Sequence, residues 1–172
     1  MLYTGHGDAG YTRVIGGSLL LKCDARVEAL GALDEAQAHL GLARALLADA
    51  PWIAALQRAQ ADLRLAMADI ATVGGKDAAY LTEARVQALE DDLRAWEPCA
   101  GGFRGFATPG DTVPGAHLHL ARTVIRRAER AIVALAQSEG GVHPLTLTYL
   151  NRLSSWVYAL CLLAEIPAEA VE

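Results

Sequence analysis

The chain has 172 residues, a length that suits one domain with a substantial core. Hydrophobic residues make up 53% of it, and the many alanines and leucines among them favour an all-α fold. The formal net charge of −5 argues against a general nucleic-acid binder, so a local basic patch would be informative.

The three cysteines are Cys23, Cys99 and Cys161, and their spacing gives neither a disulfide framework nor a C-x-x-C zinc pattern. We expect them to be thiols in a reducing compartment. Residues 1–8 lack the basic and apolar segments of a signal peptide. No apolar run reaches the ~20 residues that a membrane span needs. We therefore expect a cytoplasmic protein without a membrane segment.

Closely spaced glycines predict that roughly the first 20 residues are not helical. Beyond them the apolar residues repeat with a helical period, and proline, glycine and a capping threonine, Thr82, separate the repeats. The predicted helices span about residues 24–48, 51–72, 82–96, 114–138 and 144–167.

Residues 97–113 form a long loop rich in glycine and proline. Loops of this length inside a compact domain are uncommon and often functional. The other connections are mostly short, which predicts antiparallel neighbours in an up-down five-helix bundle. We expect a single domain over residues 1–172, with an arm at residues 1–22 and the helical bundle at residues 23–167.

The fourth predicted helix carries a concentrated cationic face, which we call the arginine stripe: Arg122, Arg126, Arg127 and Arg130. Glu129 is the single acid among these four arginines, so they cannot all be paired locally. Arginine suits a polyphosphate because its planar fork donates in pairs and stays charged. A solvated helix face with loose salt bridges remains the alternative.

The glycine-rich segment at residues 4–12 is a second candidate, because closely spaced glycines let backbone N–H groups approach a phosphate. It is not a P-loop, since no Gly-Lys-Ser/Thr follows it. A flexible N-terminal arm is the alternative interpretation.

Two further groups of polar residues lie on predicted helices. Asp34 and Glu35 are near one face of the first helix, where one of them can meet a surplus arginine or simply remain solvated. Asn151 and Ser155 share a face of the fifth helix, and an asparagine in mid-helix suggests a hydrogen-bonding task. His117 lies on the opposite side of its helix from the neighbouring histidine, and no E-x-x-H pair supports a di-iron site.

In chain order, these segments resemble the propanediol-utilisation-type ATP:cob(I)alamin adenosyltransferases. Each segment alone is weak evidence for the family, but the ordered set is specific and covers nearly the whole chain. The residues that carry the resemblance are Tyr3-Thr4, Gly7-Asp8-x-Gly10, Ile15-Gly16-Gly17, Lys22, Arg26-Val27-Glu28-Ala29-x-Gly31, Asp34-Glu35, Phe106, Pro109-Gly110, Arg122 through Arg130, and Asn151-Arg152-Leu153-Ser154.

The resemblance implies an enzyme that transfers the 5′-deoxyadenosyl group of ATP to the cobalt of cob(I)alamin, giving adenosylcobalamin and triphosphate. It implies a ferritin-like five-helix bundle that forms a homotrimer with ATP and Mg²⁺ between subunits. A cobalamin reductase and an adenosylcobalamin-dependent mutase would be transient partners. An escort that binds cobalamin and delivers it to such a mutase is the alternative function, and a purely structural bundle is a third.

The resemblance also implies roles for individual residues. Arg126, Glu129 and Phe106 would be catalytic, with Glu129 near the Mg²⁺ of ATP and Phe106 in the cobalamin site. Asp34 of one subunit would pair with Arg122 of the next. The residues implied to bind ATP are Thr4, Gly5, His6, Gly7, Asp8, Gly10, Tyr11, Thr12, Lys22, Arg126, Glu129, Arg130 and Asn151.

This sequence departs from the family pattern at Ser155, where the family usually has an aspartate. A polar contact to the nucleotide is expected to be lost or replaced there. Arg127 is rotated furthest from the other arginines of the stripe, and the resemblance gives it no role.

Overall fold

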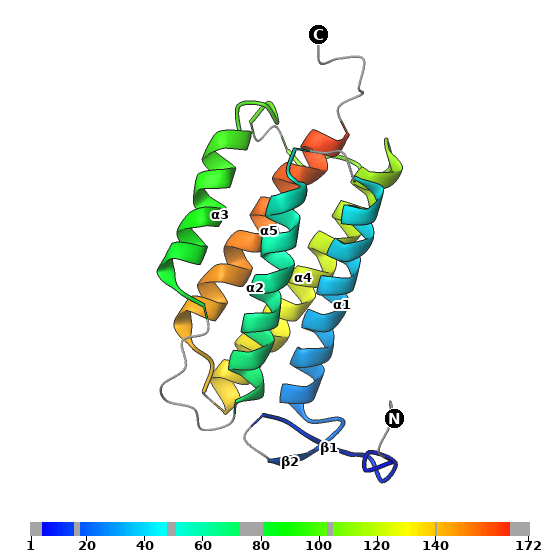
Figure 1. The fold of residues 1–172 in the computed structure, drawn as a ribbon, viewed down its shortest axis with the longest axis vertical. Helices are drawn as coiled ribbons and strands as arrows, with labels where there is room; N and C mark the ends of the chain where they lie inside the picture. Colours follow the sequence, from blue (N-terminus) through cyan, green and yellow to red (C-terminus); the bar gives the residue numbers. More distant parts are fainter. Residues whose placement is uncertain are drawn as a thin grey trace.

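A computed structural model describes residues 5–15, 18–47, 51–72, 81–102, 105–139 and 141–165. In these residues five helices run side by side in alternating directions, with a small antiparallel hairpin at one end of the bundle (Figure 1). The elements are β1 Tyr11–Arg13, β2 Leu19–Leu21, α1 Ala25–Leu46, α2 Ile53–Ala71, α3 Glu83–Trp96, α4 Val113–Ser138 and α5 Pro144–Ala164.

The all-α, up-down five-helix prediction is confirmed, and the helix ends agree with the predicted ones within about three residues. Local capping explains several of these ends. The Asp24 side chain accepts a hydrogen bond from the Arg26 N–H at 2.8 Å and starts α1. Thr112 does the same for Gly115 at 3.0 Å and starts α4. Thr82 occupies the N-cap position of α3, but its side chain makes no capping hydrogen bond.

The hairpin was not predicted. Tyr11 pairs with Leu21 and Arg13 with Leu19, so residues that the sequence marks only as non-helical form a two-stranded ribbon. Tyr11, Leu19 and Leu21 are exposed, so the ribbon presents apolar side chains to its surroundings.

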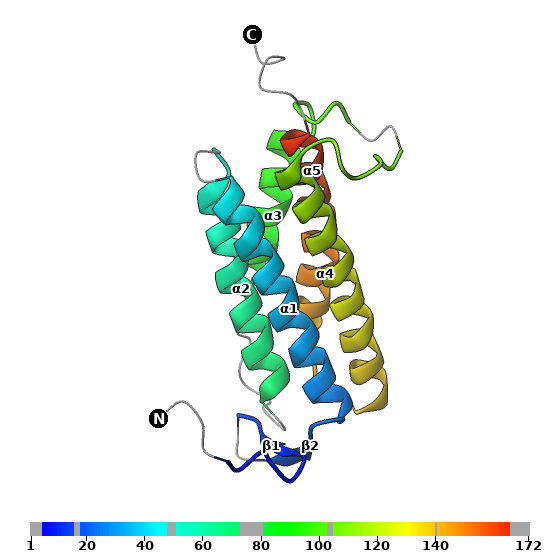
Figure 2. The ribbon, with the colours of Figure 1, turned by 90° about the vertical axis from the view of Figure 1, so that its right-hand side faces the viewer.

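The helix α4 packs against both α1 and α5 (Figure 2). α2 packs on α1, and α3 covers the outer side of α5. Leu33, Leu40, Ile125, Ile132 and Trp156 are fully buried where these helices meet. No helix in the described ranges combines the length and apolarity needed to cross a membrane.

A buried polar network ties three helices together inside this core. Asp62 of α2 is only 1% exposed and accepts a hydrogen bond from the Tyr149 hydroxyl of α5 at 3.0 Å. It also forms an ion pair with Arg85 of α3. Burial, followed by the nearby Asp62 charge, raises the pKa of Tyr149 well above its usual range, so the phenol stays a donor.

Replacing Asp62 should therefore destabilise the bundle strongly. In Asp62→Ala the Tyr149 hydroxyl and the Arg85 guanidinium lose their shared acceptor, and we expect a loss of about 3 kcal/mol in the free energy of unfolding. Urea unfolding followed by circular dichroism measures this loss. Asp91→Ala is the matched control, because Asp91 pairs with Arg94 on the exposed surface of α3. Equal unfolding midpoints for the two variants would contradict the role of the network.

Candidate functional site

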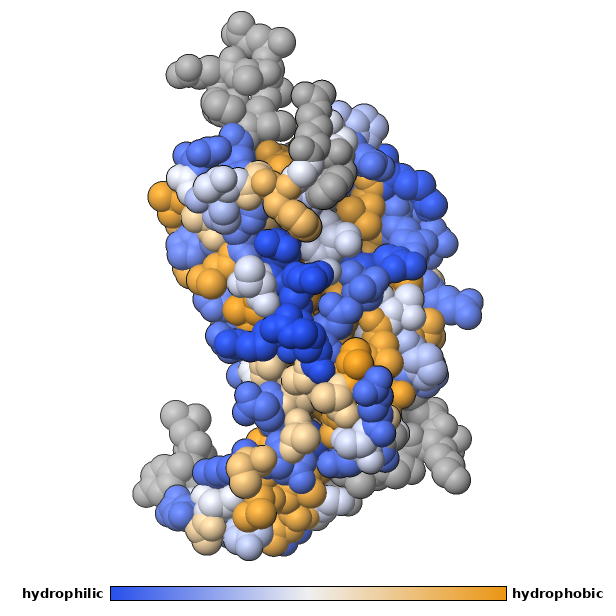
Figure 3. All heavy atoms as spheres, turned by 180° about the vertical axis from the view of Figure 1, so that it is seen from behind, coloured by the Kyte–Doolittle hydropathy of each residue, from blue (hydrophilic) through white to orange (hydrophobic). Residues whose placement is uncertain are grey.

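The arginine stripe lies on the outer face of α4. Val124, Ala128 and Ile132 are buried on the opposite face of the same helix, as the helical period predicts. From behind, the molecule shows a strongly hydrophilic band across its middle, where α4 runs, and hydrophobic surface near the hairpin (Figure 3). The helix therefore holds its arginines outward by packing its apolar side.

The four arginines have different surroundings. Arg127 forms an ion pair with Glu35 of α1, so Glu35 is the acid that meets a surplus arginine. Arg130 donates from Nη1 to the Arg126 carbonyl at 3.1 Å. Neither Arg126 nor Arg130 has a carboxylate partner within the described residues. These two guanidinium groups are therefore available to an external anion.

Glu129 is held beside these arginines by α5. Its Oε1 accepts a hydrogen bond from Asn151 Nδ2 at 3.0 Å, and the side-chain Oδ1 of Asn151 accepts one from Arg152 at 2.9 Å. Arg152 in turn pairs with Glu90 of α3 at 2.9 Å. This series of hydrogen bonds fixes the Asn151 side chain, which explains why an asparagine stands in mid-helix. A hollow of about 290 Å³ at this position is lined by Arg126, Glu129, Arg130, Val133 and Asn151.

The described residues contain no group of three or more His, Cys, Asp or Glu side chains that could hold a metal. The hollow beside the arginine stripe offers one carboxylate, Glu129. Mg²⁺ commonly binds through one or two carboxylates, several waters and the phosphates of its substrate. This donor set therefore fits a Mg²⁺ that arrives with a polyphosphate rather than one resident in the protein.

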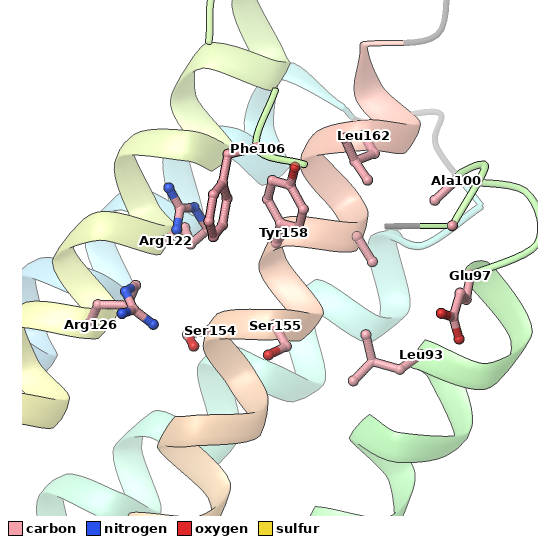
Figure 4. A pocket seen from close by; sticks show the side chains of 12 residues that line it. Leu93, Glu97, Ala100, Phe106, Arg122, Arg126, Ser154, Ser155, Tyr158 and Leu162 are labelled. Atoms are coloured by element: carbon pink, nitrogen blue, oxygen red, sulfur yellow. The ribbon is translucent and has the colours of Figure 1, made fainter. Parts of the chain in front are cut away.

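A second cavity, of about 390 Å³, opens between α3, α4, α5 and the long loop (Figure 4). Arg122 and Arg126 point into it from α4, while Leu93 and Glu97 border it on the α3 side. Its full lining is Leu93, Glu97, Ala100, Gly102, Phe106, Arg122, Arg126, Ser154, Ser155, Tyr158, Ala159 and Leu162. Arg126 lines both this cavity and the hollow beside it, so the two are neighbours.

Phe106 stands at the mouth of the larger cavity and is 75% exposed. Its ring meets the ring of Tyr158 edge-on, with centroids 5.6 Å apart. The Arg122 guanidinium lies 5.7 Å from the Phe106 centroid and 5.6 Å from that of Tyr158. The structure thus brings Phe106 and Arg122 together, which the sequence did not predict within one chain.

Tyr158 is a residue that the sequence analysis missed. Asn151, Ser154, Ser155 and Tyr158 follow the i, i+3, i+4, i+7 pattern of one helix face, and the last three of them line the cavity with Phe106. Extending the Asn151 and Ser155 face by one turn would have found it.

Behind the cavity, the end of α5 is fastened to the start of α4. Thr112 donates its hydroxyl to the Ala164 carbonyl at 2.9 Å. A Cβ on Gly115 would lie 2.7 Å from Glu165, so glycine is needed for this approach. His119 Nε2 lies 3.2 Å from Glu165 Oε1. Burial lowers the pKa of His119 against the opposing effect of Glu165, which favours a neutral imidazole.

The described part of the N-terminal arm forms two turns and then the hairpin. Asp8 donates to the Gly5 carbonyl and Gly10 to the Gly7 carbonyl, both at 3.2 Å. The Lys22 side chain crosses the first turn, and a Cβ on Gly7 would lie 3.0 Å from its Nζ. His6, Gly7, Tyr11 and Thr12 line a hollow there. Thr4 lies outside the described residues.

Within the described part of one chain, the arm residues do not reach the cavity with Phe106, and Asp34 does not pair with Arg122. The arm residues line their own hollow, at the end of the bundle opposite the long loop with Phe106 (Figure 1). Asp34 is exposed on α1 and has no ion pair among the described residues, so its predicted pairing with Arg122 is not formed inside the subunit.

Comparisons with known proteins identify the family of this chain. A sequence model described as cobalamin adenosyltransferase matches residues 2–164. A corrinoid adenosyltransferase of Bacillus subtilis is 40% identical over 162 residues, which cover 92% of this chain and 83% of that protein. The corrinoid adenosyltransferase PduO of Salmonella typhimurium is 35% identical over 92% of this chain, and the match spans 48% of that longer protein.

Solved structures of a PduO-type ATP:corrinoid adenosyltransferase from Lactobacillus reuteri have the same fold. A variant complexed with cobalamin and ATP gives a TM-score of 0.88 at 31% identity, covering 96% of this chain and 93% of that chain. Another variant, complexed with ATP, gives 0.87 at 31% identity, covering 96% and 94%. With the family match extending over nearly all of the bundle, this chain belongs to the cobalamin adenosyltransferase family.

Proposed function

We propose that this chain transfers the 5′-deoxyadenosyl group of ATP to the cobalt of cob(I)alamin, with adenosylcobalamin and triphosphate as products. The observation that carries the proposal is the position of Arg126. It lines both the cavity with Phe106 and the hollow with Glu129 and Asn151. A corrinoid in the first and a triphosphate in the second would meet at this guanidinium.

The proposed reaction requires little covalent chemistry from the protein. The reduced cobalt supplies an electron pair to the ribose 5′ carbon, and the bond from this carbon to the triphosphate oxygen breaks. No protein nucleophile is needed, and burial raises the pKa of Cys161, the thiol of the bundle core, to about 12. What the protein supplies is stabilisation of the charge that develops on the leaving triphosphate, for which Arg126 and Arg130 are suited.

The same arrangement suits the residues proposed to bind the nucleotide. Glu129, oriented by Asn151, would contact the Mg²⁺ that accompanies ATP. Lys22 and the turns of the arm would contact phosphate through an ammonium group and backbone N–H groups. The arm residues proposed to bind ATP are Thr4, Gly5, His6, Gly7, Asp8, Gly10, Tyr11 and Thr12.

We further propose that the active form is a homotrimer with sites between subunits. Asp34 is exposed without an in-chain ion pair, while Arg122 Nε is buried without a hydrogen-bond partner among the described residues. An acid from a neighbouring subunit would satisfy this guanidinium. A neighbour would also bring an arm to the arginine stripe. Unpaired cysteines support a cytoplasmic location, where a cobalamin reductase and a dependent mutase would be the partners.

The proposed activity is tested by incubating the protein with ATP, Mg²⁺ and chemically reduced cobalamin without oxygen. We expect the absorption spectrum of adenosylcobalamin to appear, together with triphosphate. Binding of preformed adenosylcobalamin without turnover would favour the escort function instead. A purely structural bundle would show no rise in melting temperature with ATP, whereas a protein that binds ATP should gain about 2.7 kcal/mol of stability at 100 times the dissociation constant.

Arg126→Ala should lower kcat by about 100-fold, because one stabiliser of the developing triphosphate charge is removed. Arg127→Ala is the matched control on the same helix, since Arg127 is already paired with Glu35. Steady-state kinetics with excess cob(I)alamin measures both. A kcat near that of the wild type in Arg126→Ala would rule out its proposed role.

Asp34→Asn should weaken the proposed contact between subunits, because the amide no longer offers Arg122 a full negative charge. We expect cobalamin affinity and activity to fall about tenfold, the scale of losing a charge from a hydrogen-bonded pair. Glu35→Gln is the control, since that acid pairs with Arg127 inside its own subunit. Equal results for the two variants, measured by cobalamin titration and light scattering, would argue against the contact.

Phe106→Ala should affect two forms of the reaction differently. An apolar ring beneath the corrinoid would displace the lower ligand of cobalt and make cob(II)alamin easier to reduce. We therefore expect the rate that starts from cob(II)alamin and a reductant to fall much more than the rate that starts from cob(I)alamin. An equal loss in both assays would reject displacement of the ligand by Phe106.

A further inference from the structure

The hydroxyl of Tyr158 holds the backbone on both sides of Phe106. It donates a hydrogen bond to the Gly105 carbonyl at 2.7 Å and accepts one from the Ala107 N–H at 3.0 Å. One hydroxyl group thus uses a donor and an acceptor position on the two residues that flank Phe106. Together these bonds fix the peptide groups from which the Phe106 side chain projects.

Glycines in unusual backbone conformations precede Phe106 in the loop. Gly101, Gly102 and Gly105 all have positive φ, with 111° at Gly105, a region open mainly to glycine. Phe106 is 75% exposed, so burial of its own ring does little to hold it in place. Besides the contacts of its ring with Tyr158 and Arg122, the position of this side chain therefore depends on the loop backbone and on what the backbone is bonded to.

Tyr158 is a rigid point of attachment. It belongs to α5, and its half-buried ring meets the His119 ring edge-on at 6.1 Å, with the Arg122 guanidinium over its face. Its ring also meets Phe106 directly, as the view into the cavity shows (Figure 4). Neighbours on α4 therefore limit the movement of the ring that carries the hydroxyl.

We propose that Tyr158 is a positioning residue whose hydroxyl aims Phe106 at the lower face of the bound corrinoid. The inference rests on the proposed function, and it makes the rate from cob(II)alamin depend on the Tyr158 hydroxyl. The hydroxyl matters for the step in which Phe106 must displace the lower ligand of cob(II)alamin. It matters little for the attack of preformed cob(I)alamin on ATP, where the ligand is already gone.

Tyr158→Phe is the direct test, because it keeps the ring beside Phe106 and removes only the two hydrogen bonds. We expect kcat from cob(II)alamin with a reductant to fall about tenfold, the scale of losing one or two such bonds. The kcat from chemically prepared cob(I)alamin should change less than about twofold, and the KM for ATP should not change. The ratio of the two kcat values is the readout.

Tyr149→Phe is the matched control. It removes the same atom from the same helix, but its hydroxyl bonds to Asp62 in the bundle core, away from the loop. We expect this variant to lower the melting temperature and to leave the ratio of the two rates at its wild-type value. A ratio that fell equally in both variants would show a general effect of destabilising α5 and would overturn the proposal.

A double variant asks whether Tyr158 acts through Phe106. If it does, Phe106→Ala with Tyr158→Phe should be no slower from cob(II)alamin than Phe106→Ala alone. A further tenfold loss in the double variant, or an unchanged ratio in Tyr158→Phe, would overturn the positioning role. Wild-type protein that forms no adenosylcobalamin from cob(I)alamin would instead refute the proposed function itself, so the two failures are distinguishable.

Discussion

The two faces of α4 are the constraint on which the rest of the molecule depends. Ile125 and Ile132 are fully buried against the neighbouring helices, so the helix cannot rotate without exposing apolar surface. This packing holds four arginines on the outer side within nine residues. Their mutual repulsion is a cost that the core must offset until partners arrive.

The structure divides the partners of these arginines. Arg127 meets Glu35 inside the subunit, whereas Arg122 lies over two aromatic rings with its Nε buried and unbonded among the described residues. Neither Arg126 nor Arg130 forms an ion pair with a carboxylate among the described residues. This division matches the proposed triphosphate at Arg126 and Arg130 and the proposed contact of Arg122 with an acid of a neighbouring subunit.

The sequence predicted the helices well because their apolar periods are long and their ends carry proline, glycine and capping residues. It left open whether Asp34 or Glu35 pairs with a surplus arginine or stays solvated, and in the structure Glu35 pairs with Arg127. The short hairpin escaped prediction, since three-residue strands such as Tyr11–Arg13 carry almost no periodic signal. The hydrogen bonds that the Tyr149 hydroxyl makes to Asp62 and the Tyr158 hydroxyl makes to the loop join residues more than 50 positions apart, and no local pattern encodes them.

The cavity between α4 and α5 shows the surroundings of Ser155, a departure from the family pattern. Ser155 lines this cavity together with Arg126, at a position where the resemblance leads one to expect an aspartate. A carboxylate there would share the cavity with the Arg126 guanidinium and draw on its charge. With a neutral serine, Glu97 at the α3 side is the acid that remains in the lining. In the proposed role of Arg126, a neutral serine beside it would leave more of its positive charge for the leaving triphosphate than an aspartate would.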